Sequence, residues 1–167
     1  MKTLIDMNVH HLEDLTASAN TLKDKVMYRY FYEQRKNYGL DFDDLVYFTL
    51  YILEHNREVR EKWQQRLEYI MVDEFQDIDK DQYALADILS GYHKNLFVVG
   101  DPDQTIYTWR GADVKFILEF DSRHENVKTI YLNTNYRSAP QILAASNALI
   151  DKNRDRLKKQ LTSVRPD

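Results

Sequence analysis

The chain has 167 residues, no cysteine and four glycines, and 23 basic against 27 acidic side chains give a formal net charge of −4. An apolar share of 43% excludes a disordered chain, and the lack of cysteine excludes a disulfide scaffold and any Cys-ligated zinc or iron–sulfur site. No apolar run is long enough to span a membrane, and no secretory signal pattern occupies residues 1–20. We therefore expect a cytoplasmic protein.

The first forty residues have the pattern of an amphipathic helix. Apolar side chains recur at steps of three and four residues: Leu12, Leu15, Ala19, Leu22, Val26 and Tyr30. Residues 37–39, Asn-Tyr-Gly, predict its end. A second helix should begin after Asp41 as N-cap, with Asp44 reaching back to complete a weak capping box. The highly charged segment 55–66 is expected to continue that helix in solvent.

Three short apolar runs then predict strands buried on both faces, at residues 69–72, 96–99 and 129–132. Helical patterns lie between these runs, so the sequence indicates an α/β fold with parallel strands. A last helix is expected to follow Ser138 as N-cap, with Gln141 at its third position. Beyond it, the tail from residue 152 to 165 is locally basic.

Each predicted strand is followed by a polar cluster, at residues 73–77, 100–104 and 133–138. In open α/β sheets, ligands bind beyond the carboxyl ends of the strands, so these clusters should converge on one edge if the strands are parallel neighbours. Adjacent carboxylates such as Asp73 and Glu74 suit Mg²⁺ binding and activation of an attacking water. Gln104 could sense a terminal phosphate, and Arg137 could neutralise charge on a transferred phosphoryl group. Taken singly, residues of these types more often form a solvated acidic turn, a loop hydrogen bond and a surface ion pair.

The segment 104–112 places Tyr107 and Trp109 beside Arg110 in a loop-like stretch after a predicted strand. Exposed aromatic rings beside arginine can stack unpaired bases, at about 1–3 kcal/mol per base. The alternative is that both aromatic residues belong to the core.

These strings together resemble the motifs of UvrD/Rep/PcrA-like superfamily 1 (SF1A) DNA helicases. Residues 72–77 resemble motif II, the Walker B-type box, residues 98–112 resemble motif III, and residues 132–138 resemble motif IV. Residues 40–45 resemble a short motif on the helix that returns from an inserted helical subdomain. Three long motifs in the family's order make a chance match very improbable.

The resemblance implies ATP-driven 3′–5′ translocation on single-stranded DNA, with unwinding at junctions of single and double strands. It implies that Asp73 binds the Mg²⁺ of Mg-ATP, that Glu74 activates the water, and that Gln104 and Arg137 contact the γ-phosphate. It further implies that Tyr107 and Trp109 stack on bases, while Arg110 supports that link through an acidic partner.

The resemblance also implies a partial RecA-like P-loop NTPase fold. Residues 1–40 would end an inserted helical subdomain, residues 41–138 would belong to the first RecA-like domain, and residues 139–167 would start the second. The P-loop pattern Gly-x-x-x-x-Gly-Lys-Ser/Thr is absent from this chain. We therefore expect a fragment that is inactive alone, with an unpaired edge on the motif III strand. That edge predicts a dimer, a domain swap or marginal stability.

Three alternatives stay open at this point. The chain could be a stand-alone module that binds single-stranded DNA or a protein, without ATPase activity. It could belong to a helicase–nuclease subunit, or it could be a structural remnant with no activity.

Overall fold

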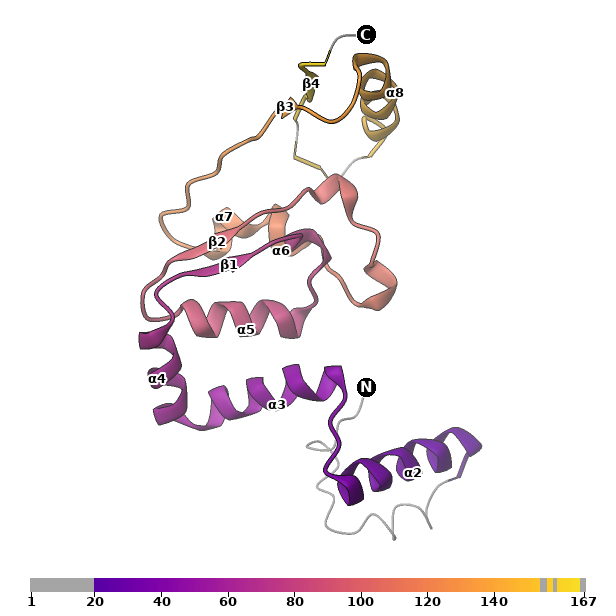
Figure 1. Ribbon diagram of the computed structural model, residues 1–167, viewed down its shortest axis with the longest axis vertical. Coiled ribbons are helices and arrows are strands. Elements are labelled where there is room, and N and C mark those ends of the chain that lie inside the picture. Colours follow the sequence, from indigo (N-terminus) through magenta and orange to yellow (C-terminus); the bar gives the residue numbers. More distant parts are fainter. Residues whose placement is uncertain (1–19, 154–155, 158, 166–167) are drawn as a thin grey trace. The chain divides into compact units, whose positions relative to one another are not determined.

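The computed structural model describes residues 20–153, 156–157 and 159–165 (Figure 1). The chain divides into two compact units, residues 1–56 and residues 57–167. The boundaries expected at residues 40 and 138 stay predictions. No helix in the described part of the chain is both long enough and apolar enough to cross a membrane.

The described residues of the first unit form helices α2 (Leu22–Asn37) and α3 (Phe42–His55). The predicted helical residues before Asn20 lie outside the described residues. The helix end predicted at residues 37–39 is confirmed, although the left-handed residue is Tyr38, with φ 52°, rather than the following glycine. The N-cap predicted for α3 is also confirmed, because Asp41 accepts from the Asp44 amide at 2.9 Å and Asp44 accepts from the Asp41 amide at 3.1 Å.

A partly buried polar cluster ties α2 to the start of α3. Gln34 donates through Nε2 to the buried Asp44 carboxylate at 2.8 Å, and Tyr30 donates its hydroxyl proton to Asp41 at 2.7 Å. The hydrogen bond from the Asp44 amide, followed by the one from Tyr30, lowers the pKa of the Asp41 carboxyl. The cap of α3 is therefore held in its charged form.

Besides three short 3-10 helices, the described part of the second unit contains five α-helices and four strands. They are α4 (Arg57–Arg66), β1 (Ile70–Val72), α5 (Lys80–Ser90), β2 (Leu96–Val98), α6 (Lys115–Leu118), α7 (Phe120–Arg123), β3 (Thr134–Asn135), α8 (Pro140–Ile150) and β4 (Thr162–Ser163). The helix predicted for the charged segment 55–66 is confirmed as α4, but the prediction that it continues the preceding helix is wrong. Asn56 has an extended backbone (φ −117°, ψ 97°) that ends α3, and α4 begins at the next residue. Asparagine favours such breaks because its amide competes for backbone hydrogen bonds.

Strands β1 and β2 pair in parallel, with Ile70 opposite Leu96 and Val72 opposite Val98. They confirm the first two predicted strands to within a residue, and α5 connects them and packs against both (Figure 1). Met71 and Phe97 lie opposite each other and are exposed, so the described residues cover one face of this sheet only. The sheet of the described residues has two strands, which leaves the outer edge of β2 unpaired.

The third predicted strand is not formed. Residues 129–132 have no strand pairing, and Leu132 is exposed. Pairing begins later, at β3, which runs parallel to β4 with Thr134 opposite Thr162. An isolated apolar run does not hold an extended strand in water without a hydrogen-bonded neighbour, and within the described ranges this run has none.

The start of α8 also differs from the prediction. Its N-cap is Ala139, and Pro140 occupies the first helical position, for which proline is well suited because it lacks an amide proton. The Ser138 amide instead donates to the Asn135 side chain at 2.7 Å. Ser138 therefore belongs to the turn before the helix, and the predicted Ser-x-x-Gln cap is wrong by one residue.

Candidate functional site

Two of the three predicted polar clusters meet at the carboxyl edge of the β1–β2 sheet. The Val99 amide donates to the Val72 carbonyl at 2.9 Å, and the Phe75 amide donates to the Val99 carbonyl at 2.9 Å. These two bonds extend the parallel ladder past both strands, so the turn after β1 lies directly against the loop after β2. The predicted convergence is confirmed for these two clusters.

The acidic pair sits on a strained turn above a buried aromatic anchor. Glu74 has φ 50°, in the left-handed region that is unfavourable for a side chain with a Cβ, at a cost of about 1–3 kcal/mol. Its amide donates to the Asp73 carboxylate at 2.9 Å. The next residue, Phe75, is fully buried and packs edge-on against Phe120, with ring centroids 5.6 Å apart. The anchor and the turn together leave both carboxylates exposed.

Gln76 is a site residue to which sequence reasoning assigned no role. Its side chain is only 1% exposed, and Nε2 donates to Glu74 at 2.9 Å and to Asp77 at 3.3 Å. Its Oε1 accepts from the Asp101 amide at 3.0 Å. The available signal was a neutral amide, which can donate and accept at once, placed between acidic residues.

Gly100 is required by the close approach of Gln76. A Cβ built at this position would lie 2.6 Å from the Oε1 of Gln76, 2.9 Å from Ile117 and 3.1 Å from the Phe75 amide nitrogen. All three distances are shorter than ordinary van der Waals contact. A side chain at position 100 would therefore separate the two loops that the Gln76 bridge joins.

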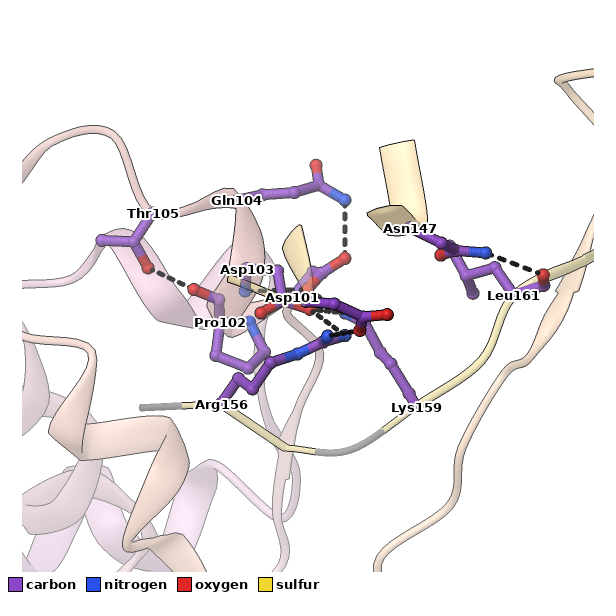
Figure 2. Close-up of polar contacts among 10 residues, drawn as sticks. Asp101, Pro102, Asp103, Gln104, Thr105, Asn147, Arg156, Lys159 and Leu161 are labelled. Carbon is purple, nitrogen blue, oxygen red and sulfur yellow. Dashed lines mark hydrogen bonds and ion pairs between the residues drawn. The ribbon is translucent and has the colours of Figure 1, made fainter. Parts of the chain in front are cut away.

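Gln104 is held by its own loop. Its Nε2 donates to the Asp101 carboxylate at 2.8 Å (Figure 2). Its backbone amide donates to the Asp101 carbonyl at 2.9 Å. Lys159 contacts the other oxygen of the same carboxylate. Partial burial acts to raise the pKa of the Asp101 carboxyl, but the hydrogen bonds from Lys159 and Gln104 outweigh burial, and the pKa is lowered.

Arg137 is not brought to this edge by any contact of the described residues. It lies between β3 and α8, is exposed, and its amide donates to the Asn135 side chain at 2.9 Å. Its carbonyl accepts from Arg165 at 2.7 Å. The condition for convergence is not met by the third cluster, because β3 pairs with β4 rather than joining the β1–β2 sheet, and the role of Arg137 stays a prediction.

The aromatic loop is exposed, as stacking on bases would require. Trp109 is 78% exposed, Tyr107 is 40% exposed, and their ring centroids are 6.4 Å apart. The Arg110 guanidinium lies 5.9 Å from the centre of the Tyr107 ring and 5.8 Å from the centre of the Trp109 ring. Within the described part of the chain, the contacts found for this guanidinium are with rings and not with a carboxylate, so the expected acidic partner of Arg110 stays a prediction.

The donor set of the acidic turn fits magnesium bound together with phosphate. No three acidic or histidine side chains of the described ranges gather closely enough to hold a metal ion on their own. Mg²⁺ usually takes one or two carboxylates and completes its shell with water and phosphate oxygens. The exposed Asp73 carboxylate at a strand end is a donor of that kind.

The structure is thus a mixed α/β fold with short parallel strands, whose carboxyl ends carry joined acidic and polar turns. The sequence profile of the UvrD/REP helicase N-terminal domain matches residues 5–125. The chain is 43% identical over 153 residues to ATP-dependent DNA helicase PcrA of Staphylococcus epidermidis, covering 89% of this chain and 21% of that relative. It is 48% identical over 126 residues to ATP-dependent DNA helicase PcrA of Staphylococcus aureus, covering 75% of this chain and 17% of that relative.

The chain belongs to the UvrD/REP helicase family, as the motifs indicated. It spans about a fifth of the length of the curated relatives that it matches.

Proposed function

We propose that this chain forms the motif II and motif III part of an ATP-dependent 3′–5′ DNA helicase, in a RecA-like domain. The observation that carries the proposal is the Gln76 bridge. It joins the Glu74 carboxylate to the Asp101 amide, and so links the acidic pair to the loop that leads through Gln104 to the aromatic residues. A motor needs such a link, because hydrolysis must be coupled to the grip on DNA.

In the proposed mechanism, Asp73 would hold the Mg²⁺ of Mg-ATP, which would supply charge neutralisation at the phosphates. The Glu74 carboxylate accepts the proton of the attacking water, while Gln76 fixes the orientation of that carboxylate through Nε2. Gln104 responds to the γ-phosphate by exchanging its bond to Asp101 for one to the nucleotide. Arg137 approaches the γ-phosphate only after a rearrangement of the residues around β3.

The DNA contacts are proposed for the aromatic loop. Tyr107 and Trp109 stack on unpaired bases, and Arg110 adds a cation–π contact and attraction to the phosphates. The partners proposed are single-stranded DNA and junctions of single and double strands, in the cytoplasm.

The chain as given contains no P-loop pattern, so we propose that it does not hydrolyse ATP by itself. The unpaired edge of β2 supports the further proposal that the free polypeptide dimerises or exchanges strands. Sedimentation checks this, and a monomer with a sharp melt that does not depend on concentration would contradict it.

A chimera tests the catalytic roles. The matching 153-residue segment of the Staphylococcus epidermidis helicase is replaced by this sequence, and ATPase turnover is measured with and without single-stranded DNA. We expect DNA-stimulated turnover that Glu74→Gln lowers by about 10²–10⁴-fold, the usual range for loss of a general base. Glu125→Gln, an exposed acid outside the site, should leave turnover unchanged. A folded chimera that binds ATP but turns over equally with Gln at position 74 would refute the assignment.

A second function, single-stranded DNA binding without ATPase activity, is favoured by the exposure of Trp109. Fluorescence anisotropy of a labelled oligothymidylate with the chain alone tests this function. Salt-sensitive binding that Trp109→Ala weakens by about 1–3 kcal/mol supports it. Binding that the substitution leaves unchanged rejects it.

A further inference from the structure

A cluster of ion pairs joins the basic tail to the loop after β2. Lys159 contacts Asp101 and lies 3.5 Å from the Asp103 carboxylate, and Arg156 lies 3.2 Å from the same oxygen of Asp103 (Figure 2). The Nη1 atom of Arg156 lies 2.5 Å from a carboxylate oxygen of Asp151. Loop and tail residues in this cluster are separated by more than fifty positions in the sequence, so the contact is tertiary.

The cluster differs from the other ion pairs of the described residues by its burial. The side chains of Asp103, Arg156 and Lys159 are 7%, 9% and 15% exposed. The other Lys and Arg pairs involve side chains that are 37–84% exposed. Exposed pairs of that kind contribute little, whereas a buried charge needs its partner.

The basic side chains of the cluster, Arg156 and Lys159, are of the kind that binds phosphate, and here they are paired with carboxylates. Arginine and lysine form charge-assisted hydrogen bonds to phosphate oxygens as readily as to carboxylates. The buried Nε of Arg156 has no hydrogen-bond partner among the described residues, so this guanidinium has a donor that neither Asp103 nor Asp151 uses. Residues 153–165 carry five basic side chains and one acidic one, which gives the tail an attraction for polyanions once the aspartates are released.

We propose that Arg156 and Lys159 form a binding site for the phosphodiester backbone of single-stranded nucleic acid, which Asp101 and Asp103 occupy when no ligand is bound. Asp101 and Asp103 compete with the phosphate groups of the ligand for the two basic side chains. We call this contact between the tail and the loop after β2 the latch. Opening the latch also changes the loop itself, because Gln104 donates to the same Asp101 carboxylate. Backbone binding by the tail is thereby coupled to the freedom of Gln104.

Binding of a labelled oligothymidylate to the 167-residue chain tests the site. Asp101→Asn with Asp103→Asn should tighten binding about tenfold, because an internally occupied site shows an affinity reduced by its open fraction. Asp43→Asn with Glu125→Gln raises the net charge equally at exposed positions outside the cluster, and should change affinity far less.

The basic residues supply the second arm. Adding Arg156→Gln and Lys159→Gln to the two asparagine substitutions should abolish the gain, and should lower the slope of log affinity against log salt by about 0.7 per lost phosphate contact. A gain that persists without the two basic side chains overturns the proposal. So does the absence of any gain in a variant whose circular dichroism matches that of the unaltered chain.

A measurement on the unaltered chain guards against misfolding of the variants. A carbodiimide joins an amine to a carboxylate only when the two are in contact, so it should link Lys159 to Asp101 or Asp103. Saturating oligothymidylate should suppress this cross-link. Absence of the cross-link in the free chain, or its persistence in the bound chain, overturns the latch.

The inference rests on the proposed function for its choice of ligand, and the two can fail separately. If Trp109→Ala has no effect while the asparagine variant gains affinity through Arg156 and Lys159, the stacking role is wrong and the tail site stands. If Trp109→Ala weakens binding while the asparagine variant gains nothing, the stacking role stands and the tail site is wrong.

Discussion

Gly100→Ala tests whether the junction of the two loops has room for a single added methyl group. The new Cβ would lie 2.6 Å from the Oε1 of Gln76 and 3.1 Å from the Phe75 amide nitrogen. Neither neighbour can yield easily, because Gln76 is buried with hydrogen bonds at both ends and Phe75 is tied to the Val99 carbonyl. Overpacking of this kind costs about 1–3 kcal/mol, a fall in Tm of about 2–12 °C for a chain of this size.

Thermal unfolding followed by circular dichroism measures the loss, and hydrogen exchange locates it. The Asp101 amide, which donates to Gln76, should exchange faster in the variant. Gly39→Ala is the matched control, because its Cβ would meet nothing closer than the Gln34 carbonyl oxygen at 4.0 Å. If both variants melt within about 1 °C of the unaltered chain, well inside the range that overpacking implies, the inferred crowding at Gly100 is refuted.

Three further predictions concern single side chains. Gln76→Leu keeps the volume but leaves the Asp101 amide without its acceptor, so the free energy of unfolding should fall by about 1–3 kcal/mol in urea titration; an unchanged midpoint would show that the bridge is unimportant. Because the pKa of Asp101 is lowered in the folded chain, its stabilising contribution is present above the ordinary aspartate pKa of about 3.9 and is lost as the pH falls through the lowered value. Asp101→Asn should therefore reduce the loss of unfolding free energy as the pH falls. A loss at low pH equal to that of the unaltered chain would contradict the lowered pKa of Asp101. Asp41→Ala removes the N-cap of α3 and should cost about 1 kcal/mol in thermal melts, whereas Asp43→Ala on the exposed first turn should cost much less; equal losses would count against the cap.

Local chemistry explains which elements could be predicted from the sequence. The Asp41 cap depends on residues three apart, and the first two strands depend on short apolar runs, so both are visible in a window of a few residues. The run at residues 129–132 is short and largely apolar, like β1 and β2, but no strand of the described residues lies beside it. Strand formation depends on a partner, and composition alone does not reveal the partner.

The same distinction applies to the candidate site. The acidic pair and the aromatic loop can be predicted as candidates because each lies within one short stretch of sequence, although the residue types alone leave other interpretations open. The contacts of Gln76 and Lys159 cannot be predicted from a short stretch of sequence, because their shared partner, Asp101, is 25 and 58 residues away. Convergence of Arg137 with the other two clusters requires one continuous sheet, and the pairing of β3 with β4 does not provide it.

At Glu74, a left-handed backbone that lowers the stability of the fold carries the side chain to which the proposed hydrolysis assigns a catalytic role. Glycine would adopt φ 50° without strain, and asparagine would adopt it at lower cost than glutamate. Either replacement would relax the turn, and either would remove the carboxylate that the proposed hydrolysis requires. At Glu74 the backbone strain and the proposed catalytic carboxylate therefore fall on the same residue, so a substitution that stabilises the fold there would be expected to cost activity.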